Sequence, residues 1–483
     1  ISDISPLVNN SGIGEGDGRA SRRDCRGYKR KVMSLTLRPY PEYRDSGLPW
    51  LGEIPTHWDL VKTKYLFRER IEKGFSEEPL LAATQTRGVV RKEHYENRTV
   101  LAMKDLHLLK LVRVGDFVIS LRSFQGGIEY AHYQGIISPA YTVLCPSQRA
   151  DPQFFSSLLK SRPYIENLTI FVTGIRQGQN IDYERLSRSF LPVPPDEEQS
   201  AIASYLAHFD RRINHLIRAK RRLIELLNEQ KQAIIHRAVT RGLDPKVRLK
   251  PSGIEWLGDV PDHYSVVPLR WHMSVGSGEF ISADQLGLER SPERPFPVIG
   301  GNGVMAYSSR FNTQEITIVI GRVGALCGNI HLVTEQSWIT DNALRVTNIK
   351  GFDMKYLALQ LQAMNLNRLA NANAQPLVTG GMIKMQRVIK PKTQEQRRIV
   401  QQLHDAVAPV DSAIDRALRK IELLREYRTR LIADVVTGKL DVRGVELPAL
   451  DESEDLDDLD TVESTEIGEG EDKDLERLVE SDV

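Results

Sequence analysis

Apolar residues recur with a helical period in two long stretches of the chain. In the first stretch they alternate four and three apart, with two polar positions completing the pattern: Ile202, Leu206, Phe209, Ile213, Leu216, Lys220, Leu223, Leu227, Gln230 and Ile234. The second stretch repeats the pattern, with a lysine at one seam position: Ile399, Leu403, Ala406, Val410, Ala413, Ala417, Lys420, Leu424, Tyr427 and Leu431. Alternating four-three spacing is the heptad of a coiled coil. We predict a helix from Asp196 to Val239, roughly 65 Å long at 1.5 Å per residue, and a second helix of the same kind.

Local signals mark the ends of both helices. Asp196 and Thr393 follow prolines and are expected to cap the helix starts, and the glycines of "TRGLDP" and "TGKLD" are expected to end the helices. Pro409 falls inside the second seam, where a proline costs about 3 kcal/mol in a straight helix. A kink or restart is therefore expected near residues 407–411.

A different pattern precedes each long helix. The runs "GDFVISL", "YTVLC", "ITIVIG" and "NALRVT" are β-branched or aromatic and bounded by turn residues, which predicts strands. "PQFFSSLLKSRPYIENL" and "MKYLALQLQAMNLNRLA" each predict one helix. Both regions are therefore expected to be mixed α/β domains.

The chain repeats itself. Ser46–Trp58 and Ser252–Tyr264 share seven of thirteen residues, and Pro194–Asp244 aligns without a gap on Pro391–Asp441 with 17 identities in 51. A Glu-Gln-x-x-Ile-x-x-x-Leu phrase accordingly appears twice, beginning at Glu198 and at Glu395. We interpret these glutamates and glutamines as residues of the first helical turn, favoured by the helix dipole and by capping. The repeat predicts a pseudo-two-fold molecule whose long helices pair antiparallel, with the two domains at opposite ends of a rigid rod.

The predicted fold is α/β (α+β), in six segments. They are a disordered or non-native leader (1–32), with Met33 as the expected natural start; a first α/β domain (33–193); a first long helix (194–244); a second α/β domain (245–390); a second long helix (391–444); and an acidic disordered tail (445–483). Two unlike domains in one chain are suited to reading two different half-sites of DNA at a fixed spacing.

Charge supports a polyanionic partner. The formal net charge is +1, but residues 451–483 hold 16 acidic and 2 basic residues, a net of −14, so residues 1–450 carry +1 − (−14) = +15. A basic body favours nucleic acid as partner. The acidic tail is interpreted as a solubilising appendage or as a competitor for the basic surface. No apolar run reaches the length of a membrane helix, so no membrane partner and a cytoplasmic location are expected.

The motifs of catalysis are absent from the sequence. It contains no Asn-Pro-Pro-Tyr or Asp-Pro-Pro-Tyr motif of amino-methyltransferases, "TGKL" lacks the other residues of a phosphate-binding loop, and "GNGVMA" is not followed by a helix pattern. His57 and His263 recur at matching places and are interpreted as structural. Cys25, Cys145 and Cys327 lack the paired spacing of zinc ligands and are expected to be ordinary thiols. We expect no catalytic residue and no metal.

The order of these signals resembles a known family. The repeated "WLGxxPxHW" segment, the "P-x-x-x-EQ-x-x-I" start of each long helix and the "Leu-Asp" exits resemble the specificity subunit of type I restriction-modification systems, over about Tyr40 to Leu447. The resemblance implies two target-recognition domains that read the halves of a split double-stranded DNA site. It implies a coiled coil that sets the spacer and docks two methyltransferase subunits, and restriction/translocase subunits in the full complex. No cofactor is expected on this chain, because the resemblance implies that S-adenosylmethionine, ATP and Mg belong to the partner subunits.

Base reading needs Arg, Asn, Gln or Ser at loop tips that enter the major groove. Glycine-rich segments offer such side chains in both domains: Arg122, Ser123, Gln125, Arg176, Gln177, Gln179 and Asn180 in the first, and Asn302, Tyr307, Ser308, Arg310 and Arg322 in the second. These are the candidate DNA-binding residues.

Two other functions remain open at this stage. A free-standing DNA-binding regulator with two reading heads would bind a defined site tightly on its own. A coiled-coil scaffold that binds only protein would confine its basic surface to the helices.

Overall fold

A computed structural model describes residues 37–85, 87–94, 105–173, 180–324, 326–370 and 376–447 of the chain. The chain divides into two compact units, one formed by residues up to Ile217 and from Leu423 onward, the other by Arg218–Glu422. Each long helix therefore contributes to both units.

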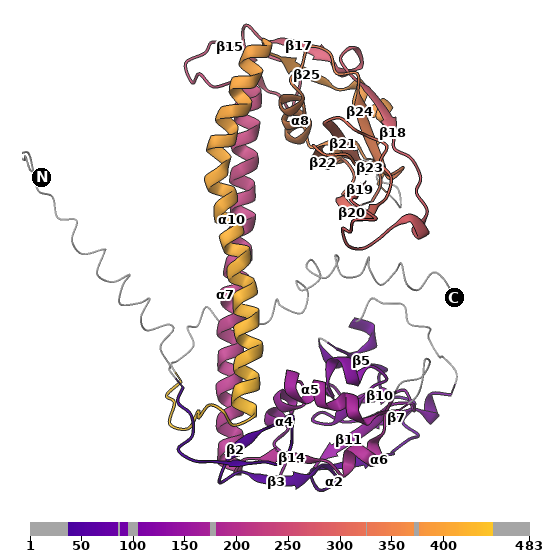
Figure 1. Cartoon of the computed structure of the whole chain (residues 1–483), viewed down its shortest axis with the longest axis vertical. Helices are drawn as coiled ribbons and strands as arrows, with labels where there is room; N and C mark the ends of the chain where they lie inside the picture. The colour runs from indigo at the N-terminus through magenta and orange to yellow at the C-terminus, as the bar shows by residue number, and fades with distance from the viewer. Residues whose placement is uncertain are drawn as a thin grey trace, which may run out of the picture. The chain divides into compact units, whose positions relative to one another are not determined.

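The first unit holds an α/β domain (Figure 1). Its strands are β1 (Tyr43–Asp45), β2 (Glu53–Pro55), β3 (Asp59–Lys62), β4 (Phe67–Arg70), β5 (Leu81–Thr84), β6 (Gly88–Arg91), β7 (Lys110–Val112), β8 (Phe117–Ile119), β9 (Glu129–Tyr130), β10 (Gly135–Ile137), β11 (Thr142–Pro146), β12 (Val172–Thr173), β13 (Asn180–Ile181) and β14 (Phe190–Val193). Its helices are α2 (Thr63–Leu66), α3 (Ser123–Gly126), α4 (Pro152–Leu158), α5 (Arg162–Leu168) and α6 (Tyr183–Ser187).

The second unit holds another α/β domain. Its strands are β15 (Leu249–Pro251), β16 (Asp259–Pro261), β17 (Ser265–Pro268), β18 (Ser274–Ser277), β19 (Phe296–Gly300), β20 (Gly303–Ser308), β21 (Thr317–Gly321), β22 (Ile330–Val333), β23 (Trp338–Ile339), β24 (Ala343–Thr347) and β25 (Arg387–Lys390). Its helices are α8 (Met354–Ala363) and α9 (Gly380–Met385). The long helices are α7 (Asp196–Arg241) and α10 (Thr393–Val436), which lie within the segments predicted to hold them.

Both domains are built on one plan. Each has a four-stranded antiparallel sheet of corresponding order, β4-β11-β8-β9 in the first and β18-β24-β21-β22 in the second. Each also has a strand pair that closes the domain before its long helix, β3 with β14 and β17 with β25. The predicted internal repeat is confirmed in the fold, although the sequences of the two domains differ.

The predicted strands are confirmed. β8, β11, β21 and β24 lie in the four runs singled out in the sequence. The side chains of β8 and β21 are buried along their whole length, as expected for a central strand that is covered on both faces. Apolar residues at consecutive positions therefore form the core of each sheet.

The predicted single helix over Pro152–Leu168 is wrong. The structure breaks it into α4 and α5, and Lys160 and Ser161 lie between them. Ser161 takes an extended conformation, and Pro163 occupies the first turn of α5, a position that proline favours. The corresponding segment of the second domain forms α8 and then a 3₁₀ turn, Leu366–Leu369, after a left-handed Asn365.

The long helices α7 and α10 run side by side and antiparallel (Figure 1). In the first unit the start of α7 packs with the end of α10, as Ile202 and Val435 share one core. In the second unit the end of α7 packs with the start of α10, as Val239 and Ile399 share another. The fold class and the antiparallel coiled coil are thus confirmed. No helix of the described residues is long and apolar enough to cross a membrane.

Ion pairs between the two helices add to this seam. Arg428 makes a bidentate contact with Asp210, both N–O distances being 2.9 Å. Lys231, which the internal repeat aligns with Arg428, donates to Asp411 at 2.6 Å. Each contact lies within one unit, and its partly exposed groups add modestly to stability.

The expected restart at Pro409 does not occur, because α10 continues from Thr393 to Val436 with Pro409 inside it. Val407 and Val410 on either side are buried, whereas Pro409 is exposed. The proline ring therefore faces solvent, and water can satisfy the carbonyl that loses its amide donor. Packing of the neighbouring valines offsets the cost of the missing hydrogen bond.

Candidate nucleic-acid interface

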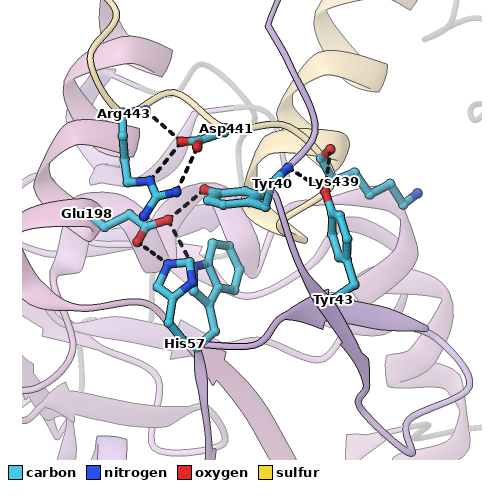
Figure 2. Close-up of polar contacts among 8 residues, drawn as sticks. Tyr40, Tyr43, His57, Glu198, Lys439, Asp441 and Arg443 are labelled. Carbon is cyan, nitrogen blue, oxygen red and sulfur yellow. Dashed lines mark hydrogen bonds and ion pairs between the residues drawn. The ribbon is translucent and has the colours of Figure 1, made fainter.

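The first Glu-Gln phrase forms a buried junction, which Figure 2 shows. One carboxylate oxygen of Glu198 accepts hydrogen bonds from the Tyr40 hydroxyl at 2.6 Å and from the Trp58 indole N–H at 2.9 Å. The other oxygen lies 2.7 Å from Nε2 of His57. Burial and the bond to Glu198 raise the pKa of Tyr40, which keeps its hydroxyl a donor. Glu198 thus fixes the start of α7 to the Ser46–Trp58 segment.

Gln199 makes a second tie at the same helix start. Its side chain is fully buried, and its Oε1 accepts from the backbone N–H of Asp151 at 2.9 Å. Its Nε2 donates to the carbonyls of Arg149 and Pro194. Asp151 is the N-cap of α4, so Gln199 joins α7 directly to a helix of the first α/β domain.

The second Glu-Gln phrase repeats this arrangement. Glu395 accepts from the Tyr264 hydroxyl at 2.7 Å and lies 3.3 Å from Nε2 of His263. Gln396 accepts from the backbone N–H of Asp353, the N-cap of α8, and donates to the carbonyls of Gly351 and Pro391. His57 and His263, for which a structural role is predicted, thus each lie against the glutamate of a junction.

The first helix turns differ from the predicted caps. The carbonyls of Pro195 and Lys392 accept the first helical hydrogen bonds, so these residues, and not Asp196 and Thr393, precede the helices. Glu198 and Gln199 lie in the first turn as predicted, but their main contacts are buried tertiary hydrogen bonds. The helix dipole is therefore the smaller reason for their presence.

Each junction also receives the end of the other long helix. Gly438 follows α10 and has a φ of 79°. It lies so close to the Ser46–Trp58 segment that an added Cβ would be 2.5 Å from the Pro55 side chain. Gly242, with φ of 71°, lies after α7 against the Tyr264 hydroxyl in the same way. The predicted glycine helix ends are confirmed, and both glycines allow close packing as well as positive φ.

The N-terminal and C-terminal described segments meet at the first junction (Figure 2). The N–H of Asp441 donates to the carbonyl of Arg38 at 2.8 Å, and the Tyr43 hydroxyl donates to the carbonyl of Lys439. The Arg443 guanidinium lies over the Tyr40 ring, 4.9 Å from its centre. These noncovalent contacts hold the two segments together in the first unit.

The polar groups of these junctions bond mainly to one another. A His–Glu pair beside a tyrosine resembles an acid–base site, but donors of the protein occupy both oxygens of Glu198. Among the described residues, no group of three or more His, Cys, Asp or Glu could hold a metal ion. Cys145 and Cys327 are free thiols, and Cys25 lies outside the described residues.

Three of the predicted DNA-binding residues of the first domain lie in the α3 loop, and they differ in solvent exposure. Arg122 and Gln125 are exposed. Ser123 is fully buried, and its hydroxyl accepts a hydrogen bond from the backbone N–H of Ser120 at 2.8 Å. Ser123 therefore shapes the turn and does not present its side chain for base contact.

The second predicted loop of the first domain is only partly described. Arg176, Gln177 and Gln179 lie outside the described residues. Asn180 is half-buried at the start of β13, and its Oδ1 accepts from the N–H of Ile181.

In the second domain, Asn302 and Arg322 lie on adjacent turns. Asn302 is exposed between β19 and β20, and Arg322 follows β21. The turns pack so closely that a Cβ on Gly321 would lie 2.5 Å from the carbonyl oxygen of Gly301. The Arg322 guanidinium lies 3.3 Å from both the Ser277 hydroxyl and the Asp341 carbonyl. These two candidates form one group.

The sequence suggested that the segment "GGNGVMAYSSR" is one loop. In the structure it is part loop and part strand. Tyr307 and Ser308 belong to strand β20, and Ser308 is buried with its hydroxyl bonded to the carbonyl of Arg310. Arg310 is exposed beyond the strand, its guanidinium 5.3 Å from the centre of the Trp338 ring. Tyr307 and Ser308 are held within the sheet, so Arg310 is a separate candidate from Asn302.

An ion pair between buried Glu129 and half-buried Lys160 lies against the α3 loop, and sequence reasoning missed it. The Lys160 ammonium lies 2.6 Å from the carboxylate of Glu129, which is 1% exposed. Burial raises the pKa of Glu129 to about 7, although Lys160 opposes the rise.

This raised pKa predicts a pH-dependent stability. The folded pKa of Glu129 exceeds its ordinary value of 4.5, so the associated stability is fully present below about pH 4.5 and is lost as the pH rises through about 7. From pH 5 to pH 9 the wild type is expected to lose about 3 kcal/mol relative to Glu129→Gln, measured by denaturant unfolding. Glu77→Gln, at an exposed site, should follow the wild type. Parallel pH profiles for wild type and Glu129→Gln would contradict this assignment.

Fold and junctions together define a class of protein: a chain of two related α/β domains, each fixed by a Glu-Gln junction to an antiparallel pair of long helices. Residues 277–422 match the family model described as the type I restriction modification DNA specificity domain.

Two curated relatives carry the same description. The chain is 31% identical over 124 residues to the type I restriction enzyme EcoprrI specificity subunit of Escherichia coli, covering 26% of this chain and 31% of that one. It is 27% identical over 172 residues to the MjaVIII specificity subunit of Methanocaldococcus jannaschii, covering 35% and 38%. The matched segments thus span about a third of the length of these relatives.

A solved structure shares the fold. One chain of a structure concerning complex assembly and conformational transition of the type I R-M system superposes with a TM-score of 0.57. The match covers 80% of this chain and 99% of that one at 14% identity. The predicted resemblance to type I specificity subunits is confirmed.

Proposed function

We propose that this chain is the non-catalytic DNA-recognition subunit of a type I restriction-modification complex. Its two α/β domains each read one half of an asymmetric bipartite site in double-stranded DNA. Partner methyltransferase subunits then methylate adenine at that site, and partner restriction/translocase subunits cut DNA that lacks the methyl group. S-adenosylmethionine, ATP and Mg belong to those partners in this proposal.

One observation carries the proposal. The two domains share sheet order and Glu-Gln junction, yet their turns carry different side chains: exposed Arg122 and Gln125 in the first, exposed Asn302 and half-buried Arg322 in the second. A common scaffold with unlike reading residues suits a target with two unlike halves. Arginine pairs with guanine edges, and asparagine or glutamine pairs with adenine edges, in the major groove. The charge of +15 on residues 1–450 supports a polyanionic target.

The test is selection of duplexes from a random DNA library by the chain assembled with its methyltransferase partners. The expected motif has two defined halves separated by a spacer of unspecified bases. The chain alone is expected to bind this motif weakly. Tight binding by the isolated chain would favour a free-standing regulator, and the absence of any motif would favour a protein-binding scaffold.

Exposed apolar residues on the long helices support partner docking. α7 presents Leu223 and Leu226 with exposed fractions of 40% and 46%, and α10 presents Leu423 and Tyr427 with 59% and 50%. The heptad pattern predicted Leu223 and Tyr427 in a dry seam, so their exposure differs from that expectation. In this proposal, these exposed apolar side chains of α7 and α10 are docking positions for methyltransferase subunits.

We expect the double change Leu223→Glu and Leu226→Glu to weaken methyltransferase assembly at least roughly 30-fold, because apolar anchors dominate interface energy. Light scattering after chromatography measures the assembly. The matched control is Gln232→Glu with Ala233→Glu, which adds the same charge at exposed positions of the same helix. Equal loss of assembly in both variants would point to charge repulsion and not to an apolar contact.

A further inference from the structure

The break between α4 and α5 places Lys160 beneath two exposed turns of the first domain. Its ammonium lies 2.6 Å from the Glu129 carboxylate, 2.8 Å from the carbonyl of Gly126 and 2.9 Å from the carbonyl of Gln85. Two of the three N–H donors of the ammonium form hydrogen bonds with the two carbonyls, and the Glu129 carboxylate supplies the opposite charge. The contacts therefore join the end of α3, the residue after β5 and strand β9 at one point.

The anchor of this cluster is buried. Glu129 is 1% exposed on β9 and pairs with Val118 of the central strand β8. The surrounding backbone is tightly packed as well, since a Cβ on Gly127, whose φ is 82°, would lie 2.5 Å from the carbonyl oxygen of Leu159. The helix break and the α3 loop consequently fit against each other with little freedom.

The side chain of Gln85 lies directly against the α3 loop. An added Cβ on Gly126 would lie 2.8 Å from Cγ of Gln85. Gln85 is exposed, as are Arg122 and Gln125 of the loop. Three side chains of the types that read bases thus stand on two separate turns held together by Lys160.

We propose that Lys160 is a positioning residue that makes these turns one reading surface, and that Gln85 is a specificity-determining residue of the first half-site. The inference rests on the proposed function and adds to it a base contact and its support. Base edges are read by hydrogen bonds whose geometry tolerates only small displacements, so side chains on two turns need a rigid link between them. In this proposal Lys160 supplies that link through its contacts with Gly126, Gln85 and Glu129.

The experiment uses the chain assembled with its methyltransferase partners at pH 8 and the motif that the wild type selects. The variant Lys160→Met with Glu129→Leu removes both charges together, because removing one alone would leave the other buried and unpaired. For each protein, the affinity for the motif is divided by the affinity for a duplex in which the first half-site is scrambled. In the double variant this ratio is expected to fall roughly tenfold or more. Affinity for the scrambled duplex should stay unchanged.

The matched control is Lys64→Met with Glu77→Leu, which removes the same charges at exposed positions of this domain and should keep the wild-type ratio. A wild-type ratio in the Lys160 variant would overturn the positioning role. A wild-type complex that selects no motif would instead refute the proposed function, so the two failures are distinguishable.

Two further variants test Gln85 and keep the ion pair. Gly126→Ala displaces the flexible Gln85 side chain at a residue whose φ is not positive, and Gln85→Ala removes its amide. Both are expected to relax base preference at the same position of the first half-site while the thermal unfolding midpoint stays unchanged. If both select the wild-type motif at every position, Gln85 does not read DNA.

Discussion

Replacing Glu198 by alanine is expected to lower the thermal unfolding midpoint of the first unit by about 10 °C. The change leaves the buried Tyr40 hydroxyl and Trp58 indole N–H without their acceptor and removes the partner of the exposed His57. Each buried donor left unpaired costs about 1–3 kcal/mol, so a total of about 4 kcal/mol is expected, and for a domain of this size each kcal/mol shifts the midpoint by about 2–4 °C. Calorimetry measures the shift.

The neighbouring residue provides the control. Glu197→Ala removes the same charge from the same helix turn at an exposed position and should shift the midpoint by no more than about 1 °C, since exposed changes are nearly neutral. Glu395→Ala should have an intermediate effect, because that carboxylate is 30% exposed and its contact with His263 is longer. Equal midpoints for the Glu198 and Glu197 variants would show that the junction does not stabilise the fold.

The second large effect is expected on DNA binding, where each double substitution should affect recognition of one half-site only. Replacing Arg122 and Gln125 together by alanine should weaken binding of the selected motif roughly 100-fold, because each lost base contact costs about 1–3 kcal/mol. The loss should disappear when the first half-site is already scrambled. Replacing Asn302 and Arg322 together should give the same pattern for the second half-site. Competition binding with duplexes scrambled in either half measures both losses.

Arg68→Ala controls for the loss of an exposed arginine, since Arg68 lies on β4, away from the candidate loops in sequence. It should leave the ratio of motif to scrambled affinity unchanged. If all variants weaken every duplex equally, these side chains contact phosphates and do not read bases.

Periodicity predicted the long helices because their packing is local and regular. A four-three alternation sustained over ten positions has few competing explanations, and the αL glycines Gly242 and Gly438 mark the ends clearly. Strands such as β8 and β21 were equally clear, because consecutive β-branched residues are buried along them. Pro409 suggested a restart that does not occur, because α10 continues through it while Val407 and Val410 beside it are buried.

The sequence did not reveal contacts between distant residues. Glu198 and Gln199 have the composition of an ordinary first helical turn, and only the fold brings Tyr40 and Trp58 to the carboxylate. The same holds for Lys160, since its partners Gln85, Gly126 and Glu129 come from three other segments. Turn residues between two strand-like runs in "LLAATQTRGVV" are the one signal that could have marked Gln85 as a loop candidate.

The two halves of the chain share their junctions but differ at their exposed turns. This difference suggests that attachment of the domains and the proposed DNA recognition use separate residues. The Glu-Gln junctions hold each domain to the long helices through nearly the same bonds in both halves. The exposed turns lie on elements outside these junctions, so their residues can change without altering the attachment. Recognition can therefore vary while the scaffold stays constant.

Adenine methylation across the genome tests the central claim most directly. The methylomes of cells that contain the methyltransferase partners are compared with and without this chain. We predict N6-methyladenine in one asymmetric split motif that appears only with the chain and whose first half alone is lost in the Arg122→Ala, Gln125→Ala variant. An identical methylome with and without the chain would contradict the account.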